Sequence, residues 1–586
     1  MTGQPAFLGV DHSLTGRRWD GPDPATDRAG RALAQATGLP DVLSHILAAR
    51  GVEATEANAF LEPKLRDLMP DPSTLRDMDR AVEVMLAAQR AGTRIAVFAD
   101  YDVDGGASAA LLLEWFGALG QRPTLYVPDR INEGYGPNVP ALEALAAEHG
   151  LIICVDCGTL SYAPIAAVRA AGAQVIVLDH HQSGETLPEA EAVVNPNRQD
   201  ESGDLGHLCA ATVVFLALVA ANRTLRAEGQ SGPDLMSMLD LVALATVADV
   251  APLIGLNRAL VRSGLAVMAR RARPGLVALS DIAKLASAPT AYHLGFLLGP
   301  RVNAGGRVGA ADLGARLLTA TDPGEAATLA TRLDALNTER REIEALVLEE
   351  AKAQAERRGL DGSLVWAAGE GWHPGVVGIV AARLKDWANR PAVVIGLEGD
   401  EGKGSARSVS GVDLGVAIAR LTQEGHLLKG GGHKMAAGLT LARDALEPAM
   451  ERLANLLERQ GVGQDGPRAL RIDAALTPAG ATIDLIIQLE QAGPFGAGNP
   501  APRLALANAQ LTSTRRAGAN HLQLRLADEG GGRLEAIAFR AFDTAFGADL
   551  EALAGQRVHV VGRLEIDDWG GRQRAKLRVE DAARVP

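Results

Sequence analysis

Three short apolar runs, each followed at once by an aspartate, constrain the fold of this chain more than any other feature. The runs are RIAVFA before Asp100, LIICV before Asp156 and QVIVL before Asp179. Runs of this length predict buried strands, and the longer stretches between them predict helices. Such an alternation predicts an α/β fold with a doubly wound, largely parallel sheet. Because ligands bind beyond the carboxyl ends of the strands in such sheets, we expect the aspartates at a functional edge.

Carboxylates are concentrated after the first run, in the segment ADYDVDGG. Asp100, Asp102 and Asp104 are two residues apart, and in an extended chain this spacing points all three side chains the same way. Three like charges held together are unfavourable unless a cation neutralises them. An EF-hand is excluded, because a strand precedes the acids and no glutamate occupies the twelfth position. The spacing therefore predicts a site for a divalent cation.

The LDHH segment after the third run adds further potential ligands. It offers a carboxylate from Asp179 and the imidazole of His180, while Asp156 and Asp249 follow other predicted elements. Carboxylates with a single imidazole favour Mn²⁺ or Mg²⁺ over Zn²⁺, which prefers more His or Cys ligands. Two such ions can activate water and stabilise a leaving oxygen in phosphoester cleavage.

Length and charge distribution favour several domains with a relatively basic C-terminal end. A chain of 586 residues is too long for one core and predicts three or four domains. The formal net charge is −13, but residues 501–586 hold 13 Lys and Arg against 11 Asp and Glu, a balance of +2 that leaves −15 elsewhere. Nucleic-acid binding needs only a local basic track, so the acidic total does not exclude it.

The cysteines and the N-terminus favour a cytoplasmic protein. Cys154 and Cys157 form a C-x-x-C, but only Cys209 remains, so no second pair completes a zinc site. Ordinary buried cysteines are favoured over a redox pair. The N-terminus lacks the basic and apolar segments of a secretory signal. No apolar stretch reaches the roughly 18 residues that span a bilayer, so we expect no membrane partner.

We expect six segments along the chain. A helix predicted from 326–358, which contains no proline or glycine, would extend roughly 50 Å and connect two α/β domains. Short strands separated by turns predict a small barrel of the OB type at the C-terminus. The expected segments are a helical extension (1–85), an α/β domain (86–320), a connecting helix (321–360), a second, smaller α/β domain (361–460), a transition segment (461–500) and the barrel (501–586).

Seven motifs, in this order, resemble the DHH phosphoesterase superfamily and within it the bacterial RecJ-type exonucleases. The motifs are DYDVDG, VDCG, LDHH, TVADVAPL, GPRVNAGGR, GGGHKMAAG and PFGAGNPAP, and the resemblance extends from about Leu43 to the C-terminus. It implies a catalytic DHH domain at 86–320, a substrate-binding DHHA1 domain at 361–460 and an OB-fold domain at 501–586. It also implies a 5′-to-3′ exonuclease specific for single-stranded DNA, releasing 5′-mononucleotides in DNA repair and recombination.

The resemblance further implies two divalent cations, Mn²⁺ or Mg²⁺, that share Asp156 as a bridging ligand. Many smaller superfamily members carry a histidine at the position of Phe98, and here Asp100 takes its place. His181 is then available to donate to the scissile phosphate, where negative charge develops. The implied ligands are Asp100, Asp102 and Asp156 for one cation, and Asp104, Asp156, His180 and Asp249 for the other.

The same resemblance implies residues that bind the nucleic acid. Consecutive glycines let backbone N–H groups approach a phosphate closely, although a flexible turn is the alternative. For each arginine the alternative is a salt bridge, and Tyr135, which could stack on a base, could equally be a core residue. The candidates are Arg130, Ser405 and Arg407 for a 5′-phosphate pocket, Gly430, Gly431, Gly432 and His433 for phosphate contacts, and Arg301, Asn303 and Arg307 for holding the strand.

The C-terminal barrel carries an aromatic and basic run typical of a single-strand track. This run contains Trp569, Arg572, Arg574, Lys576 and Arg578. By resemblance, the partners are single-stranded DNA, a single-strand-binding protein and a RecQ-type helicase. Two alternatives stay open: a phosphoesterase for small substrates, whose chains are usually shorter and lack the barrel, and a replication scaffold with an inactive DHH core, which the intact acidic set disfavours.

Overall fold

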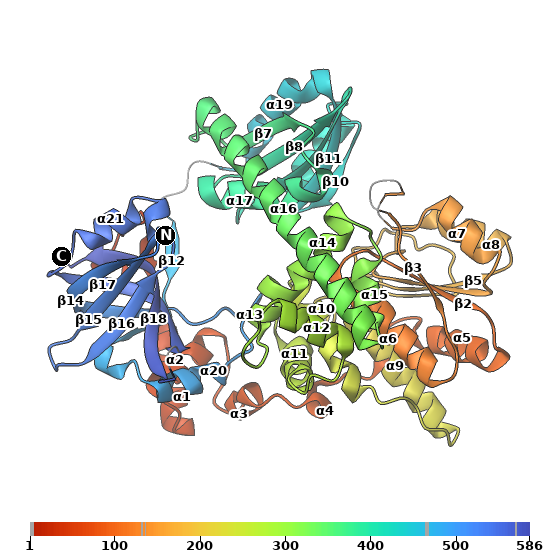
Figure 1. The fold of residues 1–586 in the computed structure, drawn as a ribbon, viewed down its shortest axis with the longest axis horizontal. Coiled ribbons are helices and arrows are strands. Elements are labelled where there is room, and N and C mark those ends of the chain that lie inside the picture. Colours follow the sequence, from red (N-terminus) through yellow and green to blue (C-terminus); the bar gives the residue numbers. More distant parts are fainter. Residues whose placement is uncertain (1–4, 130–132, 135, 463–467, 569–570, 586) are drawn as a thin grey trace. The chain divides into compact units, whose positions relative to one another are not determined.

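The computed structural model describes residues 5–129, 133–134, 136–462, 468–568 and 571–585 (Figure 1). The chain folds into two compact units. The larger unit contains Pro70–Ala251 and Ser263–Asp465, and the smaller unit contains Met1–Met69, Pro252–Arg262 and Gly466–Pro586.

A five-stranded parallel sheet forms the first domain of the larger unit, in the order β3-β2-β4-β5-β6. Every residue of β2 and β4 is buried, because helices cover both faces. Helices α7 and α8 pack on one face, and α6 and α9 lie on the other (Figure 1). The elements are α5 (Met78–Ala91), β2 (Ile95–Ala99), α6 (Val103–Ala118), β3 (Thr124–Tyr126), α7 (Val139–Ala146), β4 (Leu151–Val155), α8 (Tyr162–Ala170), β5 (Gln174–Leu178), β6 (Ala192–Val194) and α9 (Ala210–Ala227).

Helix α9 corrects the prediction that no apolar stretch is long enough to span a bilayer. It is the one helix among the described residues with that length and hydropathy, 18 residues with a mean hydropathy of 1.3. However, 72% of it is buried inside the domain, where it packs against α6 and the sheet. Its apolar composition therefore reflects a core position.

Further helices follow the sheet and lead to a long connecting helix. Helix α16 (Pro323–Arg358) has 36 residues, about 54 Å at the usual rise. It begins where the Asp322 side chain accepts a hydrogen bond from the Glu325 N–H, and it ends before Gly359, whose φ is 92°. The preceding elements are η3 (Met236–Met238), α10 (Leu239–Ala248), α11 (Gly255–Met268), α12 (Pro274–Ile282), α13 (Ala291–His293), the π-helical turn η4 (Leu294–Leu298), α14 (Gly299–Val308) and α15 (Leu313–Thr319).

A second α/β domain continues from α16. Its mixed sheet has the order β10-β11-β9-β8-β7, in which only the β7–β8 pair is parallel. Helix α17 packs on β8 and β9 together with α16, and α18 packs on the opposite side with α19. The elements are β7 (Val365–Glu370), α17 (Pro374–Ala388), β8 (Ala392–Glu398), β9 (Glu401–Arg407), α18 (Leu414–Gln423), β10 (Lys429–His433), β11 (Ala436–Ala442), η5 (Arg443–Ala445) and α19 (Leu446–Glu458).

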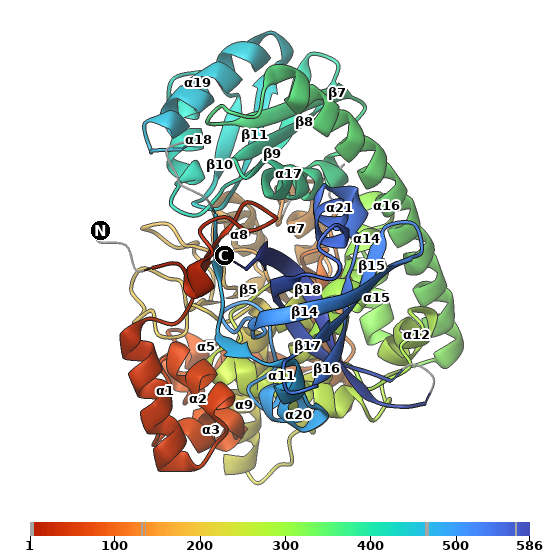
Figure 2. The same ribbon diagram turned by 90° about the vertical axis from the view of Figure 1, so that its left-hand side faces the viewer.

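The smaller unit contains a five-stranded barrel, closed by pairing of β14 with β17 (Figure 2). Apolar side chains of alternate strand residues fill its interior. Strand β13 pairs with β14 outside this ring. The elements are β12 (Ala469–Arg471), β13 (Ala474–Leu476), η6 (Pro478–Gly480), α20 (Ile483–Glu490), β14 (Leu504–Ala517), β15 (His521–Ala527), β16 (Arg533–Ala538), η7 (Ala541–Asp543), α21 (Phe546–Glu551), β17 (Arg557–Asp567) and β18 (Arg574–Arg584).

N-terminal residues complete the core of this smaller unit. Strand β1 (Arg18–Asp20) pairs in parallel with β12, and the buried Trp19 donates from Nε1 to Asp581 at 3.0 Å. Leu43 and Leu47 belong to the same buried cluster as side chains of α20. The N-terminal helices therefore share a buried cluster with α20 and with Leu504 of β14. The remaining elements are η1 (Phe7–Gly9), α1 (Pro24–Thr37), α2 (Asp41–Ala49), α3 (Ala57–Leu61) and α4 (Leu65–Leu68) here, and η2 (Pro72–Thr74) in the larger unit.

The PFGAGNPAP motif is a packing loop of the smaller unit. Its Ala497 carbonyl accepts a hydrogen bond from the Leu253 N–H at 2.7 Å. Asn499 is buried and donates from Nδ2 to the carbonyls of Ala492 and Pro494, which closes the loop on itself. The Arg258 guanidinium donates to the Gly493 carbonyl at 2.6 Å. The motif therefore holds the segment Pro252–Arg262 against the rest of this unit.

Candidate metal centre

The turn between β2 and α6 brings the three aspartates of the first motif together. Strand β2 ends at Ala99, and Asp102 is already the N-cap of α6, accepting the N–H groups of Asp104 and Gly105 at 2.8 and 3.1 Å. The prediction that an extended chain aligns these side chains is wrong, because the free amides at the helix start curl the chain around Asp102. Gly105 is required here, since a Cβ would lie 2.4 Å from the Asp100 carbonyl oxygen.

Asp104 is anchored by the start of helix α9. Its carboxylate oxygens accept hydrogen bonds from the N–H groups of Ala210 and Ala211 at 2.7 and 2.8 Å. These amides have no partner within the helix and lie at the positive end of its dipole. The side chain is 1% exposed, and this burial still raises the pKa of Asp104.

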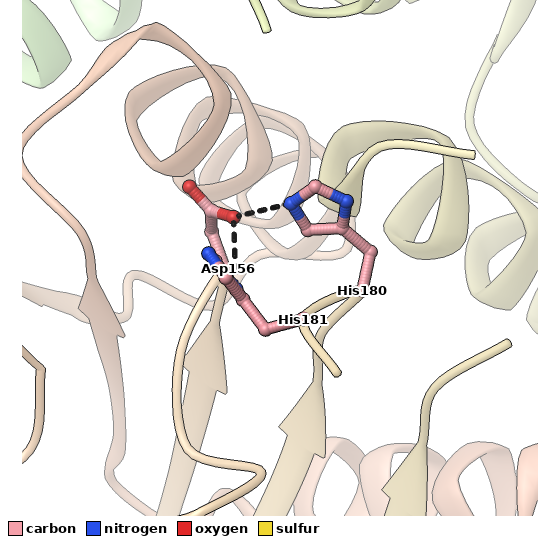
Figure 3. A group of neighbouring side chains, drawn as sticks. All are labelled: Asp156, His180 and His181. Carbon is pink, nitrogen blue, oxygen red and sulfur yellow. Dashed lines mark ion pairs between the residues drawn. The ribbon is translucent and has the colours of Figure 1, made fainter. Parts of the chain in front are cut away.

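Asp156 directs its carboxylate at the two histidines of the LDHH segment (Figure 3). Its backbone has a φ of 59°, a left-handed conformation that aspartate tolerates better than most residues. Oδ1 lies 3.3 Å from His180 Nε2 and 3.9 Å from His181 Nδ1. This oxygen is buried and accepts no hydrogen bond from the part of the chain that the structure describes. Buried polar atoms are normally satisfied, so a bound cation fits this position.

Level strand ends explain why the acidic side chains meet. Ala99 pairs with Val155 and Val155 with Leu178, so β2, β4 and β5 end at the same edge. Helix α10 ends at Ala248 beside them and adds its C-cap residue Asp249. Ligand atoms lie within 4.8 Å of one another in three groups: Asp100 with Asp102 and Asp156, Asp104 with His180 and Asp249, and Asp156 with His180 and His181.

Burial and mutual repulsion raise the pKa values of the clustered carboxyl groups. Burial raises the pKa of Asp156 well above its usual range, and the charges of Asp104 and Asp102 raise it further. Burial also raises the pKa of Asp249 to about 8, again with the charges of Asp104 and Asp102 adding to it. A divalent cation favours the ionised form of such groups. Carboxylate oxygens with few imidazole nitrogens fit Mn²⁺ or Mg²⁺.

Asp179 holds the histidine turn instead of offering a further carboxylate to this cluster. Its Oδ1 accepts the N–H groups of His180 and His181 at 2.7 and 3.2 Å, and the His181 Nδ1–H at 2.8 Å. Burial alone would lower the pKa of His181, but the hydrogen bond to Asp179 and its charge raise it to about 9. In the protein without cations, His181 is thus a protonated, half-exposed donor beside the acidic cluster.

The three cysteines are buried and form no disulfide. Burial raises the pKa of Cys154 to about 12 and that of Cys157 well above its usual value. Cys157 donates from Sγ to the Val155 carbonyl at 3.3 Å. Burial thus keeps both thiols protonated in the protein without metal, as is typical of ordinary buried cysteines.

Helix α14, from the GPRVNAGGR motif, supports the acidic loop. The side-chain oxygen of Asn303 accepts a hydrogen bond from the N–H of Val103, the first residue of α6, at 2.9 Å. A Cβ at Gly306 would lie 2.7 Å from the ring of Tyr101. The motif therefore packs closely on the turn that carries the aspartates.

The two arginines of this motif make contacts within the protein. Arg301 forms an ion pair with Asp334 of α16 at 2.8 Å, and Arg307 donates to the Gly375 carbonyl at the start of α17 at 3.1 Å. The salt-bridge alternative thus describes Arg301 in this structure. The expected strand contacts of both residues stay predictions.

The glycine cluster is an edge strand, β10, and not a flexible turn. Gly431 pairs with Gly438 of β11, which pairs in turn with Ser405 of β9. A Cβ at Gly431 would meet nothing within 4 Å, whereas a Cβ at Gly430 would lie 2.7 Å from the hydroxyl of Thr422 in α18. Gly430 therefore allows α18 to pack closely, and Gly431 lies on the opposite face of the sheet, where its own Cβ position is open.

The register places four of the expected phosphate-binding residues on that opposite face. Helix α17 packs over β9 on this face, where a Cβ at Gly378 would lie 3.2 Å from Arg407 Nη2 and from the Ser405 hydroxyl. Successive residues of a strand alternate between faces, so residues two apart share one. Arg407 donates from Nη1 to the Ser405 hydroxyl at 2.8 Å, and burial lowers the pKa of Arg407. The four residues are Ser405, Arg407, Gly431 and His433.

The barrel carries an aromatic residue that the sequence interpretation missed. Phe539 is 47% exposed, and the Arg578 guanidinium lies 5.5 Å from its ring centre. The ring of His521 packs edge-on against Phe539 at 5.3 Å. Phe539 follows strand β16, about forty residues from Arg578 in the sequence, and its only local signal is a large aromatic at a strand end. Three expected residues, Arg130, Tyr135 and Trp569, lie outside the described residues.

Family models match three parts of the chain, and curated relatives match nearly all of it. The single-stranded-DNA-specific exonuclease RecJ of Escherichia coli (strain K12) is 37% identical over 93% of this chain and 96% of its own length. The Bacillus subtilis protein of the same name is 33% identical over 97% of this chain and 71% of its length. The models are those of the DHH family N-terminal domain (94–246), the DHHA1 domain (361–459) and the RecJ OB domain (472–581).

The chain belongs to the RecJ family. A solved RecJ structure, the Thermus thermophilus protein in complex with Mn²⁺, superposes with a TM-score of 0.80 at 29% identity, covering 96% of this chain and 79% of that one. The predicted resemblance and fold class are therefore confirmed: a parallel-sheet domain, a long helix, a second α/β domain and a C-terminal barrel. The exact boundaries of the six segments stay predictions.

Proposed function

We propose that this chain is a metal-dependent exonuclease that degrades single-stranded DNA from the 5′ end and releases 5′-mononucleotides. The convergence of carboxylates and imidazoles at one edge of a RecJ-family DHH sheet carries this proposal. We place the reaction in DNA repair and recombination, in the cytoplasm, as the family membership suggests.

The acidic cluster would hold two divalent cations, Mn²⁺ or Mg²⁺, with Asp156 shared between them. Asp100 and Asp102 would complete one position, and Asp104, His180 and Asp249 the other. The ligand atoms of Asp156 lie close to those of Asp100 and Asp102, and Asp156 Oδ1 also lies 3.3 Å from Nε2 of His180, which belongs to the other group. When bound, such cations lower the pKa of water and stabilise charge on phosphate oxygens.

His181 would donate a hydrogen bond to the scissile phosphate. Its Nδ1 is taken by Asp179 at 2.8 Å, so Nε2 is the nitrogen that can face a substrate. A charged donor beside developing negative charge stabilises the transition state more than the ground state. The half-exposed position of the ring supports this role.

The face of the sheet that carries Ser405, Arg407 and Gly431 would bind the terminal 5′ phosphate and set the polarity. Arg407 offers a charged fork of donors beside the Ser405 hydroxyl, and Gly431 leaves the backbone of an edge strand open to close approach. Arg130 is proposed for the same pocket, and Tyr135 is proposed to stack on a base. The barrel would bind the strand further along, and a single-strand-binding protein and a RecQ-type helicase are proposed as protein partners from family resemblance.

The proposal is tested with single strands labelled at the 5′ or the 3′ end, alongside duplex DNA and RNA. Incubation with Mn²⁺ or Mg²⁺ should release labelled mononucleotide at once from the 5′-labelled strand only, and EDTA should stop the reaction. Immediate release from the 3′-labelled strand, or equal cleavage of duplex, would contradict the polarity or the single-strand specificity.

A further inference from the structure

A pair of asparagines holds the backbone of both histidines in the LDHH segment. After β6 the chain runs through Asn195 and Asn197, and their side-chain amides donate to the carbonyls of His181 and His180, at 2.8 and 2.6 Å. Asn195 is completely buried. Its orientation is determined, because its Oδ1 accepts the Asn197 N–H at 2.7 Å and Nδ2 must therefore donate.

The second donor bond of Asn195 leads to a buried hydroxyl. Asn195 Nδ2 also donates to Thr159 Oγ1 at 2.8 Å. Thr159 Oγ1 in turn lies 2.6 Å from Asp179 Oδ2, which also accepts the Thr159 N–H at 3.1 Å. Since an amide nitrogen only donates and a carboxylate only accepts, the Thr159 proton points to Asp179.

The remaining oxygen of Asp179 determines the state of the His181 ring. With Oδ2 occupied by Thr159, Oδ1 faces the turn and takes the His181 Nδ1–H at 2.8 Å. The bond fixes how the ring is rotated, as outer partners do for metal-bound histidines. Asp179 Oδ1 also accepts the backbone N–H of the proposed ligand His180 at 2.7 Å, but the bonds from Asn195 through Thr159 and Asp179 to His181 include no side chain of a proposed metal ligand.

We propose that Thr159 and Asn195 are positioning residues for His181, acting through Asp179; this inference rests on the proposed function of His181 as a donor to the scissile phosphate. They keep the imidazole aimed with Nε2 toward the substrate. Neither residue belongs to the acidic cluster, and their effect is exerted on the orientation of one ring.

Thr159→Val tests the inference, because it removes the hydroxyl and keeps the shape of the side chain. We expect kcat on single-stranded DNA to fall about 10- to 100-fold, the usual cost of losing an outer partner. KM and the Mn²⁺ concentration for half-maximal rate should change less than twofold. Thr159→Ser should restore the rate, and Thr224→Val, the same change on helix α9, should have no effect.

A double-mutant cycle separates positioning from a general structural role. In the His181→Ala background, Thr159→Val should lower kcat less than twofold further, because the ring that it orients is gone. If the two changes multiply, Thr159 acts on something other than His181 and the inference is overturned. Thr159→Ala, which removes the same hydroxyl, replaces the valine variant if valine disturbs folding.

A measurement without substrate or metal distinguishes this inference from the proposed function. In EDTA, the low-field NMR signal of the His181 Nδ1–H, assigned by its loss in His181→Ala, should shift upfield in Thr159→Val and stay in place in Thr159→Ser. An unchanged signal in Thr159→Val overturns the inference. If the signal responds but the wild-type protein does not cleave single-stranded DNA, the proposed function fails and the positioning network stands.

Discussion

Asp156 has a left-handed backbone conformation, and its carboxylate is buried beside other carboxylates. Its backbone has a φ of 59°, and the buried carboxylate faces His180. Both properties follow from its place directly after a strand of the parallel sheet. The residue therefore costs stability in the absence of cations and is a natural point for a shared ligand.

We expect Asp156→Asn to abolish hydrolysis while the fold is retained. Asparagine tolerates the left-handed backbone and has the same shape, but it lacks the negative charge. Turnover on single-stranded DNA should fall by more than about 100-fold, beyond the loss of an outer partner. Saturating Mn²⁺ should raise the melting temperature of the wild-type protein more than that of the variant. Asp204→Asn, at an exposed site, is the control, and near-normal turnover of the variant in saturating Mn²⁺ would refute the shared role.

The raised pKa of Asp249 predicts the pH dependence of stability without metal. The folded protein holds this proton up to a pKa of about 8, whereas the unfolded chain releases it near the ordinary value of 3.8. The resulting stabilisation is complete at low pH and is lost as the pH rises toward 8. In EDTA, the free energy of unfolding should thus fall between pH 5.5 and 8.5 by less in Asp249→Asn than in the wild type. Equal falls, measured by urea unfolding, would contradict a raised pKa.

Strand β10 contains three consecutive glycines, and the structure gives a reason for two of them. Gly430 makes room for α18, and Gly432 has a φ of 152° and would place a Cβ 2.4 Å from the Ala436 carbonyl oxygen. Gly431, between them, has open space at its Cβ position. Two of the three glycines are thus explained by packing or backbone conformation, and the third is not.

We therefore expect Gly431→Ala and Gly432→Ala to differ. Gly432→Ala should destabilise the second α/β domain by about 1 kcal/mol or more, because the backbone must give way. Gly431→Ala should leave the melting temperature unchanged and weaken binding of 5′-phosphorylated single strands, because the added methyl group blocks close approach of a phosphate. Thermal unfolding and titration with labelled oligonucleotides measure both effects. Unchanged binding in Gly431→Ala would contradict a phosphate contact at Gly431.

At the scale of the whole molecule, the N- and C-terminal parts form one unit. Trp19 hydrogen-bonds Asp581, and Leu43 and Leu47 share a core with Leu485 of α20. Removing the barrel strands would therefore expose apolar side chains of α1 and α2 as well. Substitutions on the barrel surface test its role more cleanly than a deletion does.

The exposed pair Phe539 and Arg578 allows such a test. Base stacking is worth about 1–3 kcal/mol per base, so Phe539→Ala should weaken binding of long single strands with little change in salt dependence. Arg578→Ala should lower the slope of log affinity against log salt by about 0.7, the value for one phosphate contact on a single strand. Arg516→Ala, at an arginine paired with Glu551 at 2.6 Å, is the control. Unchanged affinity and slope in both variants would assign this surface to protein contacts.

The amino-acid sequence alone determined the parallel sheet, the edge at which its acids meet, the long helix and the barrel. These features follow from local periodicity: buried runs of five residues form strands, and a 36-residue stretch with one glycine, beside its N-terminal proline, forms a helix. The proximity of Asp100, Asp156 and His180 could be predicted in the same way, because all three follow the ends of predicted parallel strands. Spacing predicts such proximity because parallel strands end together.

Only the tertiary structure decided how those residues are held. The curled turn at Asp102, the supporting role of Asp179 and the edge strand at Gly431 each depend on partners far away in the sequence. The same is true of α9, whose apolar composition resembles a membrane span until its burial in the domain is seen. Hydrogen bonds and packing between distant segments have no signature in local periodicity, and they determine which of several locally possible conformations and roles each residue takes.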